Sequence, residues 1–206
     1  HQDLPESQVP ERAVEMLKVV GIPEPGKRAG EYPHVFSGGM RQRAMIAMSL
    51  SCNPSLLIAD EPTTALDVTI QAQILELMKE LRTSFGASIL LITHDIGLVA
   101  ELTENVAVMY SGHIVENAST GRLFENPCHP YTQGLISSIP KPDVDVQRLA
   151  TIPGVVPDAL NPPTGCRFHP RCPKAMDICK TDDPKTTKVE AGHTVSCFLF
   201  RDEKQS

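Results

Sequence analysis

Two acidic residues that follow a short apolar run have the chemistry needed to act on a phosphate ester. Residues 56–59 are all apolar, and Asp60 and Glu61 come directly after them. Neighbouring side chains at a strand end point in different directions, so Asp60 can help to hold Mg²⁺ while Glu61 faces an attacking water. Phosphoryl transfer to water needs this division of roles. The simpler interpretation of the pair on its own is the start of a solvated loop.

Two further segments carry groups that suit a phosphate. Ser37, Gly38 and Gly39 precede an expected helix, where a hydroxyl and unhindered backbone N–H groups form an anion site. His94 follows the apolar run 89–92 and can donate to a γ-phosphate. Taken singly, the glycines indicate a flexible helix cap and His94 a loop histidine, which is also how we interpret the other six histidines. No G-x-x-x-x-G-K-[ST] loop occurs, so these groups can complete a nucleotide site but cannot begin one.

Helices and strands alternate around these groups. We expect helices over 11–20, 38–52, 68–85, 96–102 and 131–138, strands over 55–59 and 88–92, and a hairpin of 106–109 with 113–116. Asp67 can cap the helix that follows it, and Gly86 can end that helix. Strand, helix and strand in this order predict a parallel α/β sheet. The wholly apolar strands are typical of a sheet that is covered on both faces.

The composition limits the class of protein. A chain of 206 residues with 41% hydrophobic content can form one ordinary domain with a small appendix. Its net charge of −6 argues against a nucleic-acid partner, because phosphate backbones attract clustered Lys and Arg. The longest apolar runs are far shorter than the roughly 20 residues of a membrane span, and no segment has the pattern of a secretory signal. We therefore expect a cytosolic protein that can contact a membrane protein.

The order of these motifs resembles that of the ATP-binding subunits of ABC transporters. Phe36–Met40 resembles the signature motif of that family, and Leu56–Glu61 resembles its Walker B strand. Ala65–Asp67 resembles the D-loop, and His94 resembles the switch histidine. The resemblance implies that Asp60 helps to hold Mg²⁺, that Glu61 is the general base or water-orienting residue, and that His94 contacts the γ-phosphate of ATP. It also implies a head-to-tail dimer in which residues of the signature contact ATP bound mainly by a second ATPase subunit. These residues are Ser37, Gly38 and Gly39, and Asp67 would couple the two sites.

The same resemblance implies an α/β fold that is a partial P-loop NTPase. Residues 1–35 would end the helical subdomain, residues 36–126 would form the ATPase core, and residues 127–206 would be a loop-rich C-terminal extension. The Walker A loop, the adenine-stacking aromatic residue and the glutamine loop of this family lie upstream of these motifs and are absent here. We therefore predict that the 206 residues alone neither bind ATP tightly nor hydrolyse it.

Four of the six cysteines lie between residues 166 and 197, in the proline-rich segment that follows Asn126. This four-cysteine set consists of Cys166, Cys172, Cys179 and Cys197. Four thiolates can hold zinc or an iron–sulfur cluster. Zinc sites usually contain tight C-x-x-C pairs, and their absence here favours an iron–sulfur cluster over zinc. Free thiols or disulfides are the structural alternative, and a reducing cytosol disfavours disulfides. We interpret Cys52 and Cys128 as ordinary small residues.

This segment resembles the C-terminal extension of oligopeptide and dipeptide importer ATPases, some of which carry a 4Fe-4S cluster on such cysteines. The resemblance rests on His129–Thr132, Ile152–Gly154 and Asn161–Cys172. It implies an ATPase subunit, peripheral on the cytoplasmic face of the membrane, that uses ATP and Mg²⁺. The implied partners are transmembrane permease subunits, a second identical or related ATPase subunit and, indirectly, an extracytoplasmic peptide-binding protein.

Three other functions stay open at this point. Importers of nickel or other solutes share related subunits. Soluble ABC ATPases of DNA repair or translation share the signature and the Asp60–Glu61 pair. The acidic net charge and the cysteine- and proline-rich C-terminal segment of this chain are not typical of them. A regulatory module that natively lacks a P-loop is the non-enzymatic alternative.

Overall fold

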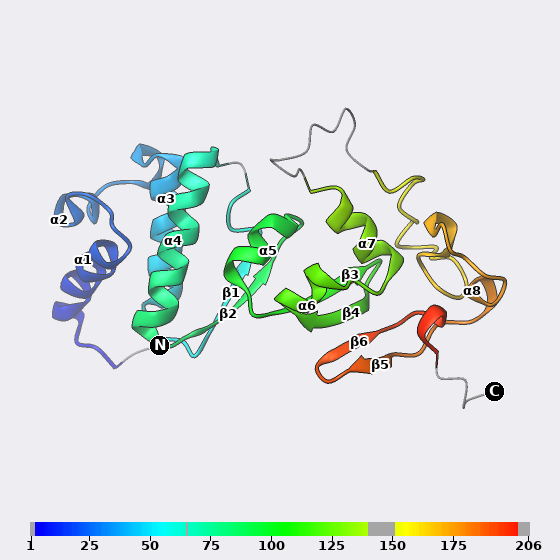
Figure 1. Cartoon of the computed structure of the whole chain (residues 1–206). Coiled ribbons are helices and arrows are strands. Elements are labelled where there is room, and N and C mark those ends of the chain that lie inside the picture. Colours follow the sequence, from blue (N-terminus) through cyan, green and yellow to red (C-terminus); the bar gives the residue numbers. More distant parts are fainter. Residues whose placement is uncertain (1–2, 65, 140–150, 202–206) are drawn as a thin grey trace. The chain divides into compact units, whose positions relative to one another are not determined.

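The computed structural model describes residues 3–64, 66–139 and 151–201, which fold into two compact units, 1–94 and 95–206 (Figure 1). Unit 1 contains α1 (Val9–Val19), α2 (Pro25–Arg28), α3 (Gly38–Leu50), β1 (Leu56–Asp60), α4 (Val68–Phe85) and β2 (Ser88–Ile92). Unit 2 contains α5 (Ile96–Leu102), β3 (Asn105–Tyr110), β4 (His113–Ser119), α6 (Thr120–Glu125), α7 (Pro130–Ser137), α8 (Ile178–Thr181), β5 (Thr187–Glu190) and β6 (His193–Val195). Short 3₁₀ helices cover Glu6–Gln8, Pro33–Val35, His169–Arg171 and Phe198–Phe200.

Capping residues set the bounds of the two longest helices of unit 1. The Ser37 hydroxyl accepts a hydrogen bond from the Met40 N–H at 3.3 Å, where α3 begins. The Asp67 carboxylate accepts one from the Ile70 N–H at 2.9 Å, where α4 begins. Gly86 adopts a φ of +63° and ends α4. These contacts satisfy backbone groups that a helix end leaves unpaired, and they confirm the predicted N-caps and the predicted end of α4.

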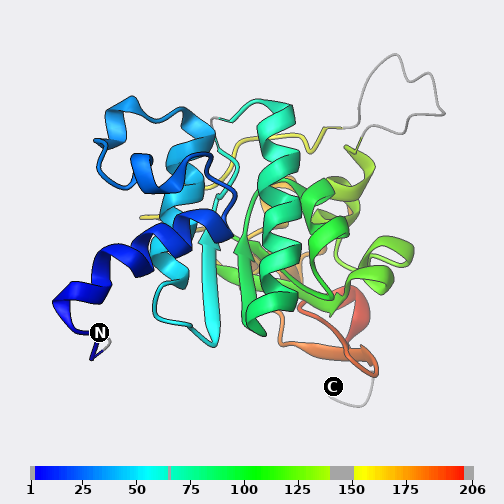
Figure 2. The ribbon, with the colours of Figure 1, turned by 90° about the vertical axis from the view of Figure 1, so that its left-hand side faces the viewer.

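The sheet of unit 1 is parallel, as the sequence predicts. β1 pairs with β2 from Leu56↔Ser88 to Asp60↔Ile92, and Figure 2 shows the two arrows side by side. Both strands therefore end at the same edge of the sheet. The residues that follow β1 and those that follow β2 meet at this edge, which is where ligands bind in open α/β sheets.

Helices cover one face of this sheet. Its core consists of Met16, Val20, Ile22, Phe36, Ile46, Ala47, Leu50, Leu57, Ala59, Ile74, Leu77, Met78 and Leu81. On the other face, four large apolar side chains are exposed by 46–59%, namely Leu56, Ile58, Leu90 and Ile92. The prediction that both faces are covered is wrong for the described residues, because a single layer of helices packs on the strands. The apolar composition of the open face suits a second layer.

Unit 2 is built on an antiparallel sheet in the order β3-β4-β6-β5. The predicted hairpin is confirmed, with Ser111 and Gly112 at positive φ in its turn. The second hairpin turns at Gly192, whose φ is +76°, and it was not predicted because strands of four and three residues give little alternation. The C-terminal segment therefore adds strands to the sheet as well as loops. Residues 140–150, which include two of its many prolines, lie outside the described residues.

An aromatic cluster forms the centre of unit 2. Phe168 is 2% exposed, and its ring centroid lies 5.1 Å from that of Tyr110, 5.4 Å from that of Tyr131 and 5.6 Å from that of His129. His129 and His193 are each 1% exposed, so the interpretation of these two as loop histidines is wrong. One nitrogen of each buried ring has a hydrogen-bond partner inside the protein, Nδ1 of His129 and Nε2 of His193. Among the helices of the described ranges, none has the length and apolarity to cross a membrane.

Candidate functional site

Glu61 and His94 meet at the edge where β1 and β2 end. The Nδ1 atom of His94 lies 2.8 Å from Glu61 Oε1, and the Thr64 hydroxyl donates to Glu61 Oε2 at 2.8 Å. Both carboxylate oxygens are therefore held. The Glu61 and His94 side chains are 39% and 80% exposed, so a ligand can reach them. Sequence reasoning missed Thr64, whose only signal is its position three residues after Glu61.

The backbone of Glu61 adopts an uncommon conformation. Its φ is +50°, in the left-handed region that side chains other than glycine rarely occupy. The Glu61 N–H donates to the Ile92 carbonyl at 2.9 Å, which extends the ladder between the two strands by one bond. Strained residues of this kind persist where surrounding contacts fix them, and they cluster at functional sites. Here the backbone bond and the two side-chain bonds fix the direction of the carboxylate.

The hydrogen bonds to Glu61 lower its pKa below the ordinary value of 4.5. His94 makes the largest contribution and Thr64 the second, because donors stabilise the charged form of a carboxylate. Glu61 is thus ionised at neutral pH and can accept a hydrogen bond or a proton from water. Asp60 is the last residue of β1 and is also exposed, so two adjacent carboxylates stand at this edge.

The signature residues are brought together with the D-loop segment at the beginning of α3 and α4. A Cβ on Gly39 would lie 2.8 Å from the Ile70 Cγ2, closer than real contacts allow, and one on Gly38 would lie 3.7 Å from Leu66. Gly39 is therefore required for the packing of α3 against α4. Gly38 is exposed, as is the Ser37 that caps α3. Ala65, the first residue of the predicted D-loop, lies outside the described residues.

The members of the four-cysteine set lie near one another in unit 2. The set consists of Cys166, Cys172, Cys179 and Cys197, all of them free thiols. Burial raises the pKa of Cys197 to about 11, and the charges of the other three thiols add to this rise. The Cys166 N–H donates to the Cys179 carbonyl at 2.9 Å. At Gly165, with a φ of +67°, a Cβ would lie 2.5 Å from the same carbonyl oxygen, so the two loops need glycine to approach this closely.

The spacing of the thiols bears on what they can hold. Zn–S bonds of about 2.3 Å in a tetrahedron place sulfurs about 3.8 Å apart. Within the described residues, one group of three or more His, Cys, Asp or Glu ligand atoms lies within 4.8 Å of one another, and its members are Glu116, Cys128 and His193. The four-cysteine set is more open than that. No three of its four sulfur atoms lie within 4.8 Å of one another.

Comparison with known proteins finds matches along nearly the whole chain. Residues 2–64 match the family model described as ABC transporter, and residues 115–179 match "Oligopeptide/dipeptide transporter, C-terminal region". The chain is 56% identical over 203 residues to the oligopeptide transport ATP-binding protein AppD of Bacillus subtilis, covering 98% of this chain and 62% of AppD. It is 49% identical over 203 residues to the dipeptide transport ATP-binding protein DppD of Escherichia coli, with the same coverage.

A solved structure shares the fold. The structure of cbiO1 from Clostridium perfringens, part of the ABC transporter complex cbiONQ, is similar with a TM-score of 0.54 and 32% sequence identity, over 61% of this chain and 49% of that one. The chain spans 62% of the length of AppD. The motifs, the fold and the relatives of the chain all indicate the same family. The chain belongs to the ATP-binding proteins of ABC transporters, in the oligopeptide/dipeptide branch of that family.

Proposed function

We propose that this chain forms the hydrolytic part of an ATPase subunit that powers the import of oligopeptides or dipeptides. The carboxylate of Glu61 carries the proposal, because it is ionised and held through both oxygens at the carboxyl edge of a parallel sheet. The substrate class follows from the transport proteins AppD and DppD, to which the chain is similar. The 206 residues contain no P-loop, so the proposed enzyme needs further residues that bind the phosphates of ATP.

In the proposed reaction Glu61 orients the attacking water and accepts its proton. The water oxygen bonds to the γ-phosphorus, the bond from that phosphorus to the bridging oxygen breaks, and ADP leaves with the electron pair. His94 holds Glu61 and donates to the γ-phosphate. Mg²⁺, held with the help of Asp60, would neutralise charge on the phosphates.

We further propose that the signature residues act across a dimer. Ser37, Gly38 and Gly39 stand at the N-terminus of a helix of 13 residues, where N–H groups and the helix dipole favour an anion. Their phosphate would belong to ATP bound mainly by a second ATPase subunit, identical or related. Asp67, whose carboxylate caps α4, would couple the two sites.

The four-cysteine set is proposed to hold a 4Fe-4S cluster through Cys166, Cys172, Cys179 and Cys197, with zinc as the alternative. The convergence of the thiols and their open spacing support the cluster. Protein purified without oxygen should then be brown and contain iron and sulfide in comparable amounts. Stoichiometric zinc without iron would establish the alternative.

The subunit would sit on the cytoplasmic face of the membrane against transmembrane permease subunits, which an extracytoplasmic peptide-binding protein supplies. Residues 1–35, the end of the helical subdomain, would contact the permease. Residues 36–126 would form the ATPase core and residues 127–206 the extension.

Uptake measurements test the transport function. A strain without the gene should lose ATP-dependent uptake of labelled dipeptides or oligopeptides, and the full gene should restore it, whereas the gene with Glu61→Gln should not. Labelled nickel serves as a parallel substrate. If the full gene restored nickel uptake in the deletion strain but left peptide uptake unaffected, the subunit would belong to the nickel importers of this family.

A further inference from the structure

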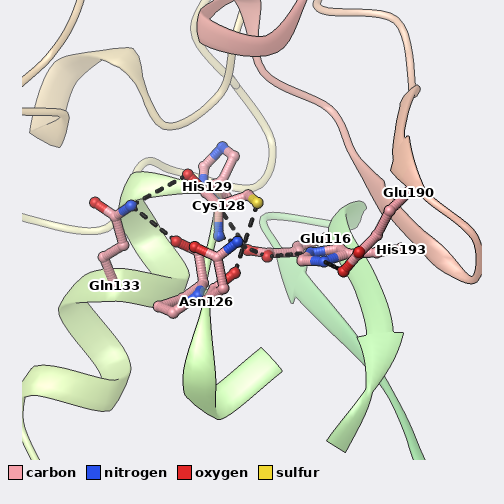
Figure 3. A network of polar contacts seen from close by, with 8 residues as sticks. Glu116, Asn126, Cys128, His129, Gln133, Glu190 and His193 are labelled. Atoms are coloured by element: carbon pink, nitrogen blue, oxygen red, sulfur yellow. Dashed lines mark hydrogen bonds and ion pairs between the residues drawn. The ribbon is translucent and has the colours of Figure 1, made fainter. Parts of the chain in front are cut away.

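A buried carboxylate joins the C-terminal hairpin to the rest of unit 2. Glu116 of β4 is 1% exposed and accepts three hydrogen bonds (Figure 3). The Cys128 N–H donates to Oε1 at 2.7 Å, the His129 N–H donates to Oε2 at 2.8 Å, and His193 Nε2 lies 2.8 Å from Oε1. A buried charge is costly unless it is paired and hydrogen-bonded. These three donors compensate Glu116, so the contacts depend on one another.

His193 is held through one nitrogen of its ring, Nε2. Because Glu116 is a carboxylate that accepts two backbone N–H groups, we infer that His193 Nε2 carries a proton and donates it to Oε1. On the other side, Nδ1 lies 3.8 Å from Glu190 Oε1. Arg122 in turn donates to the Glu190 carboxylate at 2.6 Å. The first residue of β6 is thus fixed by Glu116 of β4, whereas Nδ1 makes no hydrogen bond to the described residues.

The position of Cys197 follows from the register of β6 on β4. The pairing is short, with Glu116↔Val195 and Asn117↔Thr194. The Ser196 N–H then donates to the Val115 carbonyl at 2.8 Å, and Cys197 is the next residue. A slip of one residue would turn every side chain of β6 to the opposite face. Because this ladder has only two residue pairs, it specifies the register of β6 weakly. An additional contact at the first residue of β6 therefore has a large effect on which register forms.

The same side chains also have the composition of an ion site, since ligand atoms of Glu116, Cys128 and His193 lie within 4.8 Å of one another. Two observations favour a structural contact instead. Three donors already occupy the carboxylate. Burial, together with the charges of Glu116 and Glu190, raises the pKa of Cys128 and disfavours the thiolate that a metal needs.

We propose that Glu116 and His193 form a register pin, a buried contact that positions Cys197 for the four-cysteine site. Glu116 and His193 are positioning residues and touch no metal group themselves. The part of the proposal that concerns metal loading rests on the proposed function of the cysteines. The part that concerns register does not, because the Ser196–Val115 bond reports it directly.

Four variants of the full chain test the pin. His193→Phe keeps a ring but removes the donor, whereas His193→Gln keeps a donor near the place of Nε2. Asp183→Asn is the matched control, because Asp183 Oδ2 lies 3.6 Å from His113 Nδ1 in an exposed contact that also joins β4 to the C-terminal segment. Cys128→Ala tests the ion site. Iron, sulfide and zinc per chain, the visible spectrum and amide hydrogen exchange at Ser196 are measured for each, and thermal melting identifies variants that do not fold.

We expect His193→Phe to lower metal content at least threefold and to raise exchange at Ser196 at least tenfold, with partial rescue in His193→Gln. Asp183→Asn and Cys128→Ala should match the wild type. A folded His193→Phe variant with wild-type exchange at Ser196 would overturn the pin. Loss of bound zinc in Cys128→Ala would overturn it in favour of an ion site. A wild-type chain without metal would overturn the proposed metal group, while exchange at Ser196 still decides the pin.

Discussion

His94 Nδ1 lies 2.8 Å from Glu61 Oε1 and joins two residues that are 33 positions apart in the chain. The contact exists because β1 and β2 are parallel and end at one edge, so each strand delivers its next residues to the same place. Thr64 holds the second oxygen of Glu61. A carboxylate fixed in this way can orient water without first rearranging, which is the main protein contribution to phosphoryl transfer.

Replacement of His94 by alanine should raise the pKa of Glu61. The hydrogen bond from His94 is the largest cause of the lowered value, so its loss moves the pKa back toward 4.5. A carboxylate whose pKa is lowered by folding contributes fully to stability at pH values above its pKa in the unfolded chain. That stabilisation is lost as the pH falls through its pKa in the folded protein. An NMR titration of the Glu61 side-chain carbon should show a midpoint below 4.5 in the wild type and a higher one in His94→Ala. The exposed His34, replaced by alanine, is the control, and equal midpoints in all three would contradict the account.

Replacement of Gly39 by alanine should destabilise unit 1. The new Cβ would lie 2.8 Å from Ile70 Cγ2, and crowding of this kind costs about 1–3 kcal/mol, offset in part by the better helix propensity of alanine of up to about 1 kcal/mol. Urea unfolding should therefore show a lower midpoint, and Ile70→Ala should reduce the effect in a double-mutant cycle. Gly26→Ala, where a Cβ meets open space, should not destabilise. A cost at Gly39 that is unchanged by Ile70→Ala would refute the packing argument.

Asp67 should have separable roles in stability and in coupling. Its carboxylate caps α4 through the Ile70 N–H at 2.9 Å, so Asp67→Ala should lower the free energy of unfolding by about 1 kcal/mol. Asn also caps helices well, so Asp67→Asn should unfold like the wild type. If Asp67 couples two ATP sites, the asparagine variant of the complete subunit should nevertheless lose cooperativity for ATP. If the Asp67→Asn subunit bound ATP with the cooperativity of the wild type, the proposed coupling role of Asp67 would be contradicted.

The open face of the β1–β2 sheet should make the 206-residue chain associate. Ile58 and Leu90 are 59% and 49% exposed on neighbouring strands of this face, and contiguous apolar surface of this kind drives aggregation. The double variant Ile58→Thr, Leu90→Thr should scatter less light at high concentration than the wild type. Val155→Thr, at a site that is 88% exposed and does not belong to this sheet, is the control. Cooperative unfolding of a wild-type monomer at high concentration would count against this prediction.

The sequence predicts unit 1 better than unit 2, for physical reasons. Helix caps such as Ser37 and Asp67 and the breaker Gly86 act locally, so their effects can be read from neighbouring residues. The Glu61–His94 contact could be anticipated because two apolar runs in a parallel sheet must end together.

The contacts of unit 2 are longer in range. Glu116 and His193 are 77 residues apart, and neither stands in a periodic pattern that relates them. His193 begins a strand of three residues, too short for alternation to be recognised. Burial of His129 depends on Phe168, which lies 39 positions away, and no local signal reports that packing.

The most direct test of the central claim is ATP hydrolysis by the subunit that contains this chain together with its P-loop. We expect steady phosphate release from the wild type and a loss of at least 100-fold in Glu61→Gln, with ATP binding retained, because removal of a general base costs about 10²–10⁴-fold. Glu76→Gln, at an exposed glutamate of α4, should hydrolyse ATP like the wild type. A Glu61→Gln subunit that turns over ATP at the wild-type rate would contradict the assignment of Glu61 as the hydrolytic residue.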